Sequence, residues 1–201
     1  GVAVLSIFYI VIVVALSLMS PWFFSFNNAM NIGINMSYIG LMAAAGTPLI
    51  IAGGLDLSVA AVAGLTGVLI TIFFGWIDNV WLAVILSVFV GAFIGAFNGF
   101  LATVLKFNPL IATLGTMSIV TGFSLVLTGG LTKSMMLPEF NYIGVGRILN
   151  VPIPLIIMLV VMFLLWILMS KTKFGRFLYA SGNNPDASLL LGVPVVKVQF
   201  Y

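Results

Sequence analysis

Six long apolar runs dominate this sequence, and each is long enough to cross a lipid bilayer as a helix. A helical span needs about 20 mostly apolar residues, with a range of roughly 17 to 25. The runs are apolar on every side, whereas the strands of a membrane β-barrel alternate in character over about ten residues. The sequence therefore predicts an all-α, polytopic transmembrane helical bundle with six spans, near residues 2–19, 32–52, 57–74, 80–105, 110–128 and 151–170.

The composition supports a membrane protein and excludes several kinds of chemistry. Hydrophobic residues make up 63% of the chain and charged residues only 5%, against roughly 25% charged in soluble domains. Cysteine and histidine are both absent, which removes the commonest metal ligands and proton shuttles. We expect no metal, no cofactor and no catalytic residue. A net charge of +3 is too small to predict a nucleic-acid partner.

The positions of the basic residues predict the orientation. Short loops rich in Lys and Arg favour the cytoplasm, and Lys171, Lys173 and Arg176 follow the last run. Counting back from them places the loop at 106–109 inside, the loop at 129–150 outside and the N-terminus in the cytoplasm. The first run lacks the basic start and cleavage site of a signal peptide, so we interpret it as a span. Because the chain begins with Gly1 rather than Met, we expect a piece of a longer protein.

A polar turn separates the second and third runs. Gly53 and Gly54 favour a turn, and Asp56 precedes the next helix, where its carboxylate can accept hydrogen bonds from free amides near Ser58. The prediction is a capped helix entry, and the alternative is a helix break that lines a cavity. In the fourth run, Gly91, Gly95 and Gly99 form a small-residue face that predicts close helix packing. Asn98 in that run is interpreted as a hydrogen-bonding residue between helices, and the alternative is that it lines a path.

The segment after the last run has strong helix signals. Asn184 suits an N-cap, Pro185 the first helical position and Asp186 the positive end, while Gly192 ends the helix. A short helix is therefore predicted at 185–191. Its apolar corner, Leu189-Leu190-Leu191, must be buried in the bilayer interface, against this chain or in a partner. Local physics leaves these alternatives open.

Several motifs resemble a known family when read together. They are Gly53-Gly54-Leu55-Asp56-Leu57-Ser58-Val59, Asn98-Gly99, Pro109-Leu110-Ile111-Ala112-Thr113-Leu114-Gly115-Thr116-Met117-Ser118, Lys171-Thr172-Lys173-Phe174-Gly175-Arg176, Tyr179-Ala180-Ser181-Gly182-Asn183-Asn184 and Gly192-Val193. In this order, from about residue 27 to the end, the chain resembles the permease subunits of bacterial ABC importers for ribose, xylose, arabinose and galactosides.

The resemblance implies a role for the short helix and a set of partners. Such permeases pair as two subunits in the inner membrane, receive sugar from a periplasmic binding protein, and are driven by a cytoplasmic ABC ATPase that docks on a short cytoplasmic helix. Residues 1–201 would be the N-terminal part of a single permease domain, with 171–198 as the cytoplasmic loop that carries the coupling helix. The expected ATPase-coupling residues are Arg176, Asn184, Pro185, Asp186, Leu189, Leu190, Leu191 and Gly192.

The expected function is passage of a sugar by alternating access, without covalent chemistry. The chain lacks a phosphate-binding loop, since Leu127 and Thr132 replace its two glycines before Lys133-Ser134, so ATP would be used by the partner. Candidate path residues in the second run are Asn35, Ser37 and Thr47, with hydrogen bonding between helices as the alternative. A secondary transporter or channel working alone remains the alternative function, and Asp56 is the ionisable residue near enough to serve it.

Overall fold

The computed structural model describes residues 2–133 and 138–200, and it is almost entirely helical. Within these residues, six helices are long and apolar enough to cross a membrane, which confirms the predicted all-α polytopic bundle. They are α1 (Val2–Met19), α2 (Phe26–Ile51), α3 (Val59–Ile77), α4 (Val80–Thr103), α5 (Pro109–Thr128) and α7 (Ile153–Lys171). Helix α2 begins at Phe26 rather than near residue 32, because Ser25 caps it by accepting the Asn28 N–H at 3.2 Å.

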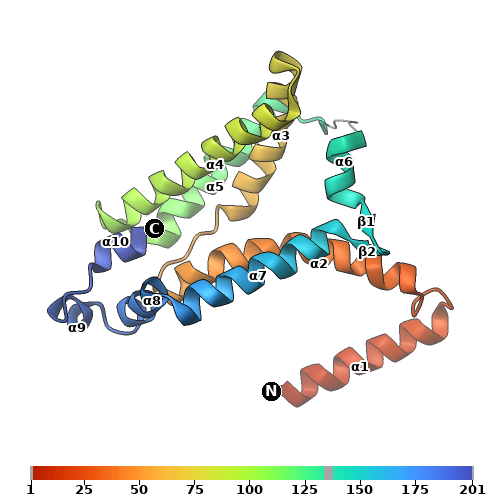
Figure 1. The fold of residues 1–201 in the computed structure, drawn as a ribbon, viewed down its shortest axis with the longest axis horizontal. Coiled ribbons are helices and arrows are strands. Elements are labelled where there is room, and N and C mark those ends of the chain that lie inside the picture. Colours follow the sequence, from red (N-terminus) through yellow and green to blue (C-terminus); the bar gives the residue numbers. More distant parts are fainter. Residues whose placement is uncertain (1, 134–137, 201) are drawn as a thin grey trace.

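The long helices pack in two units. Helices α3, α4 and α5 form one unit, and α2 and α7, which lie side by side and run in the same direction, form the other (Figure 1). Leu65, Leu69 and Val120 are the buried centre of the first unit. In the second unit Gly33 allows close approach, because a Cβ there would lie 3.2 Å from the Leu155 side chain. Direct packing between α2 and α3 is slight.

Short elements follow α5 in the segment that the sequence predicts as an outer loop. Helix α6 (Pro138–Val145) leads into a hairpin of β1 (Arg147–Ile148) and β2 (Val151–Pro152). The hairpin turn has positive φ at Leu149 (50°) and Asn150 (66°), as a two-residue type I′ turn requires. Arg147 donates hydrogen bonds to the side-chain oxygens of Asn27 (3.3 Å) and Asn31 (3.2 Å). The hairpin is thereby fixed to the start of α2.

Three short helices lie at the opposite end, where α2 and α7 finish. These are α8 (Lys173–Asn183), α9 (Pro185–Leu190) and α10 (Val195–Phe200). Helix α8 packs on α7 and α2, while α10 packs on α8 and α4. The segment α8–α10 therefore connects the two units at this end, which we call the α8 end (Figure 1).

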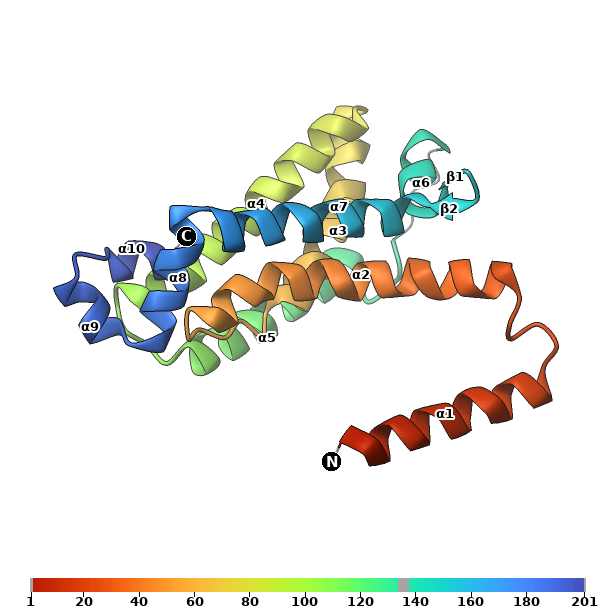
Figure 2. The same cartoon turned by 60° about the horizontal axis from the view of Figure 1, so that its bottom comes forward.

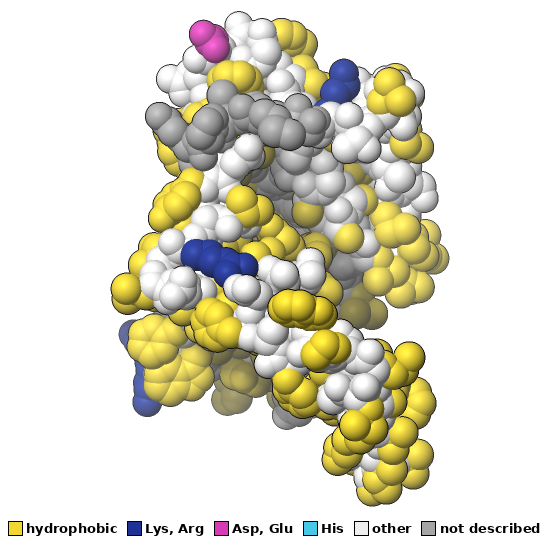
Figure 3. Space-filling view, turned by 90° about the vertical axis from the view of Figure 1, so that its right-hand side faces the viewer, with side chains coloured by type: hydrophobic (Ala, Val, Ile, Leu, Met, Phe, Trp, Pro, Cys, Tyr) yellow, Lys and Arg dark blue, Asp and Glu magenta, His cyan; other side chains and the backbone are white. Residues whose placement is uncertain are grey.

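Helix α1 lies apart from both units. It contains no buried residue, and two views show it separated from α2 by the turn that follows it (Figures 1 and 2). Its surface is covered by hydrophobic side chains (Figure 3). Such a helix is suited to lipid or to another apolar surface.

Candidate functional site

Helix α9 has the caps that its sequence predicts. The Asn184 side chain accepts a hydrogen bond from the Ala187 N–H at 3.0 Å, and Pro185 occupies the first turn. Beyond Leu191, Gly192 takes φ +80°, a conformation that glycine adopts at little cost. The Gly192 N–H donates to the Leu189 carbonyl at 3.0 Å. The predicted short helix is confirmed, with Leu191 as its C-cap rather than its last residue.

The three leucines at the end of α9, its C-cap Leu191 included, are exposed to different degrees. Leu189 is 55% exposed, Leu190 90% and Leu191 83%. By contrast, Ser188 on the same helix is buried. Of the burial alternatives for this corner, burial against the described part of this chain is therefore wrong. The two remaining alternatives are that the leucines are buried in the bilayer interface or against a partner.

Helix α8, which leads directly into α9, lies against the backbone at the ends of α7 and α2 at two positions that only glycine permits. A Cβ at Gly175 would overlap the Met169 carbonyl oxygen, and a Cβ at Gly182 would overlap that of Ile51. Thr172 caps α8 by accepting the Gly175 N–H at 3.2 Å. Arg176 lies on the exposed side, where it donates to the Thr172 carbonyl at 3.3 Å. Sequence reasoning treated this stretch as a loop, although the Thr172 cap and the buried spacing of Gly175, Leu178 and Ser181 are helical signals.

Helix α10 was also missed, and it reaches both units. Gln199 donates a hydrogen bond from its Nε2 to the Ala52 carbonyl at 3.2 Å. Gly99 of α4 faces Phe200, since a Cβ at Gly99 would lie 3.4 Å from its ring. Two residues near the end of α10 therefore contact the end of α2 and the side of α4. The predicted packing role of α4 glycines also fits Gly91, whose Cβ would lie 3.0 Å from the Thr66 side chain.

The polar turn before α3 differs in detail from its prediction. Gly53 has φ +84° and makes the turn, as expected of it. The Asp56 Oδ1, however, accepts both the N–H (2.7 Å) and the hydroxyl (2.6 Å) of Ser58. Ser58 is itself the N-cap and makes no side-chain cap bond. The predicted cap is therefore corrected: the carboxylate holds the N-cap residue, and not the helical amides after it.

A buried hydrogen-bonded chain continues from Ser58 across the first unit. The Asn98 side chain donates to the Ser58 Oγ at 2.9 Å and accepts from the Thr116 hydroxyl at 2.7 Å. Ser58 is the N-cap of α3, Asn98 lies near the end of α4 and Thr116 lies in the first half of α5; all three are buried. The interpretation of Asn98 as a bond between helices is confirmed. Such bonds average about 0.6 kcal/mol each in membrane proteins.

A cavity of about 150 Å³ lies beside this chain. Its lining includes the turn from Ala52 to Asp56, Asn98 and Gly99 of α4, Thr113 of α5 and Gln199 of α10. The alternative reading of the turn, a break that lines a cavity, thus also describes it. Among residues 2–133 and 138–200, no group of three or more carboxylate, His or Cys side chains forms a metal site.

The candidate path residues of α2 do not come together. Ser37 is fully buried and donates to the Gly33 carbonyl at 2.6 Å. Asn35 and Thr47 are exposed and bond within their own helix, to the carbonyls of Asn31 (3.2 Å) and Ala43 (2.7 Å). Twelve residues of α-helix turn Thr47 about 120° away from Asn35. The three residues therefore do not share one face of α2, and their part in a path stays a prediction.

Comparisons with known proteins support the resemblance drawn from the motifs. A family model described as "Branched-chain amino acid transport system / permease component" matches residues 28–201. The ribose import permease RbsC of Bacillus subtilis is 42% identical over 97% of this chain and 61% of its own length. The L-arabinose permease AraH of Escherichia coli is 35% identical over 95% and 58%. The xylose/arabinose permease XylH of Sulfolobus acidocaldarius is 30% identical over 88% and 51%.

The chain spans about three fifths of the length of the first two relatives. No solved structure matches it. The family model covers most of the chain, from Asn28 near the start of α2 through α10. This multi-pass membrane chain therefore belongs to the family of branched-chain amino acid transport system permease components.

Proposed function

We propose that this chain is part of the membrane-spanning permease subunit of an ATP-driven importer in the cytoplasmic membrane. The observation that carries the proposal is the capped helix α9, which presents three exposed leucines beside the basic α8. Exposed leucines of this kind need a cover. A cytoplasmic ABC ATPase is the partner that fits a coupling helix at this end, with Arg176 near its rim.

The proposed cargo is a sugar delivered by a periplasmic binding protein. Three relatives carry names that specify ribose, arabinose or xylose, which favours sugars over the amino acids in the family's description. The chain would act beside a second permease subunit. Its N-terminus would lie in the cytoplasm, and the segment at 129–150, with its hairpin, would face the binding protein outside.

The packing supports alternating access as the mechanism. A push on α9 acts on α8 and α10, which contact α2, α7 and α4. Because the two units have little direct contact between α2 and α3, a displacement of this segment tilts one unit against the other. The permease itself contributes no chemistry, and ATP is hydrolysed by the partner.

The test is the substitution Leu190→Asp in the full-length protein, with its ATPase and binding protein in vesicles. Leu190 is 90% exposed, so the fold is retained while an apolar contact is replaced by a charge. The expected result is loss of ATPase copurification and of sugar uptake. Leu149→Asp is the matched control, because Leu149 is 93% exposed in the hairpin at the opposite end. It should keep the ATPase bound.

Two outcomes would count against the proposal. If Leu190→Asp binds its ATPase and transports normally, α9 is not the docking helix. Uptake that is indifferent to ATP in the unmodified protein would instead favour a secondary transporter or channel. Size-exclusion chromatography of each variant checks that the fold is intact.

A further inference from the structure

Helix α5 has three faces of different character. One face, with Thr113, Thr116 and Val120, is buried against α3 and α4. A second face is apolar and exposed, with Ile119 at 74% and Val126 at 79%. The third carries hydroxyls at Thr121, Ser124 and Thr128, whose spacing of three and four residues puts them in one row. The third face is thus polar, whereas the other exposed face of α5 is apolar and suited to lipid.

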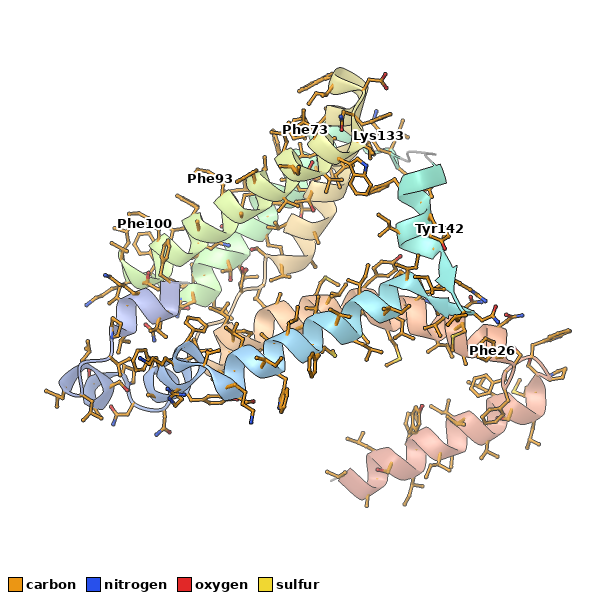
Figure 4. All side chains as sticks on the ribbon, viewed as in Figure 1. Phe26, Phe73, Phe93, Phe100, Lys133 and Tyr142 are labelled. Carbon is orange, nitrogen blue, oxygen red and sulfur yellow. The ribbon has the colours of Figure 1, made fainter. Side chains whose placement is uncertain are left out.

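An open groove lies along this third face. It has a volume of about 530 Å³, and its lining includes the hydroxyl row and Leu125 on the α5 side and Ala61, Gly64, Gly67 and Val68 on the α3 side. A Cβ at Gly64 or Gly67 would meet nothing within 4 Å. These glycines therefore serve no close packing among the described residues, and they keep the groove wide. The groove ends at Lys133, at the end of the unit far from α8 (Figure 4).

The hydroxyls of the row have bonding capacity left over. Ser124 donates to the Val120 carbonyl at 2.8 Å, and Thr128 donates to the Ser124 carbonyl at 2.9 Å, so both oxygens are free to accept. Thr121 makes no hydrogen bond to any residue that the structure describes. Each sugar hydroxyl is both a donor and an acceptor, as are Ser and Thr hydroxyls. The row therefore offers a sugar several replaceable bonds and no strong one.

A neighbouring groove shows what a lipid-facing hollow looks like in the same unit. It has a volume of about 250 Å³ and is lined almost wholly by large apolar residues, among them Phe93, Ile119 and Phe123. The two grooves flank the same helix, yet the hydroxyl row, the small residues and a lysine line only the first, whereas Thr116, whose hydroxyl donates to Asn98, lines the second. The apolar groove is suited to lipid, and the groove with the hydroxyl row is suited to a polar solute.

The geometry points to the groove between α3 and α5 as a segment of the sugar path, with Thr121, Ser124 and Thr128 as transient hydrogen-bonding partners. This inference rests on the proposed function. It also replaces the α2 residues as the path candidates. Lys133 at the mouth is suited to a polar solute entering from the end predicted to face outside.

The first test blocks the groove without disturbing the packing. Gly64→Leu adds a side chain to open space inside the groove, and Gly115→Leu adds the same side chain to open space outside it. Uptake of ribose, arabinose and xylose is measured in vesicles that contain the full-length protein, its ATPase and its binding protein. Gly64→Leu should lose uptake while keeping its ATPase bound, and Gly115→Leu should transport normally.

The second test uses the absence of cysteine from this sequence. Ser124→Cys and Val126→Cys are treated from outside with a charged, membrane-impermeant thiol reagent, which reaches thiols in water and not those in lipid. Ser124→Cys should be labelled and the transported sugar should slow its labelling; Val126→Cys should stay unlabelled. Equal labelling of both, or labelling that sugar leaves unchanged, overturns the path assignment.

The two proposals fail differently. If the unmodified protein shows no ATP-dependent uptake of any sugar, the proposed function fails. If the unmodified protein transports and Gly64→Leu transports equally well, the proposed function stands and the groove is not the path. A Gly64→Leu variant that does not fold leaves the labelling experiment as the deciding measurement.

Discussion

The contact between α8 and α2 makes a sharp prediction about Gly182. In Gly182→Ala, the new Cβ would overlap the Ile51 carbonyl oxygen and lie 2.8 Å from the Ile51 carbonyl carbon and 3.2 Å from the Ala52 Cα. All three are backbone atoms, so no side chain can rotate to make room. The two helices must move apart.

The expected loss follows from two opposing effects. Inserting one carbon into a packed contact costs about 1–3 kcal/mol, and a contact against backbone belongs at the upper end. Replacing Gly by Ala in a helix recovers at most about 1 kcal/mol. The net loss of stability is about 2 kcal/mol, which corresponds to a fall in Tm of roughly 4–8 °C.

The assay is thermal unfolding of the purified full-length protein in detergent. Gly115→Ala is the matched control, because its Cβ meets nothing within 4 Å, and it should be unchanged or slightly more stable. Uptake should fall in Gly182→Ala, since α8 is displaced from the end of α2. Equal melting temperatures for the two variants would refute the close backbone contact.

Three further predictions concern buried or bridging side chains. Ser181 is fully buried, and its hydroxyl has no partner among the described residues, so Ser181→Ala should stabilise the protein by about 1 kcal/mol; an unchanged or lower Tm would contradict this. Asn98→Ala removes the bonds to Ser58 and Thr116 and should cost at least about 1 kcal/mol, measured by unfolding of the purified protein. Arg147→Gln loses the charge that holds the hairpin to α2 and should speed proteolysis within the hairpin, while cleavage elsewhere stays the same.

Features with a local cause could be predicted from the sequence. The six long helices follow from apolar length alone, because a bilayer requires its spanning backbone to bond internally. The start and end of α9 follow from Asn184, Pro185 and Gly192, because each of these residues affects only the helix turn next to it. The small-residue face of α4 also indicated packing correctly at Gly91 and Gly99.

Features that join residues far apart in the sequence could not be predicted from it. The link between Ser58, Asn98 and Thr116 depends on how three helices rotate about their axes. The path candidates of α2 were chosen for polarity, and polarity alone does not tell which face of a helix is buried, as Ser37 shows. Thr121 is not among the path residues that the sequence predicts, because a hydroxyl in an apolar run usually bonds its own helix.

In helix α9, the residues proposed to contact a partner are not the residues that hold the helix in place. Its leucines contribute little to the packing of this chain, while its position depends on Gly175, Gly182 and the caps at Asn184 and Gly192. If the proposed docking is right, residues 189–191 can be exchanged between related permeases without a cost in stability. Such chimeras would accept a new ATPase and keep their own cargo, so the two specificities of an importer can diverge independently.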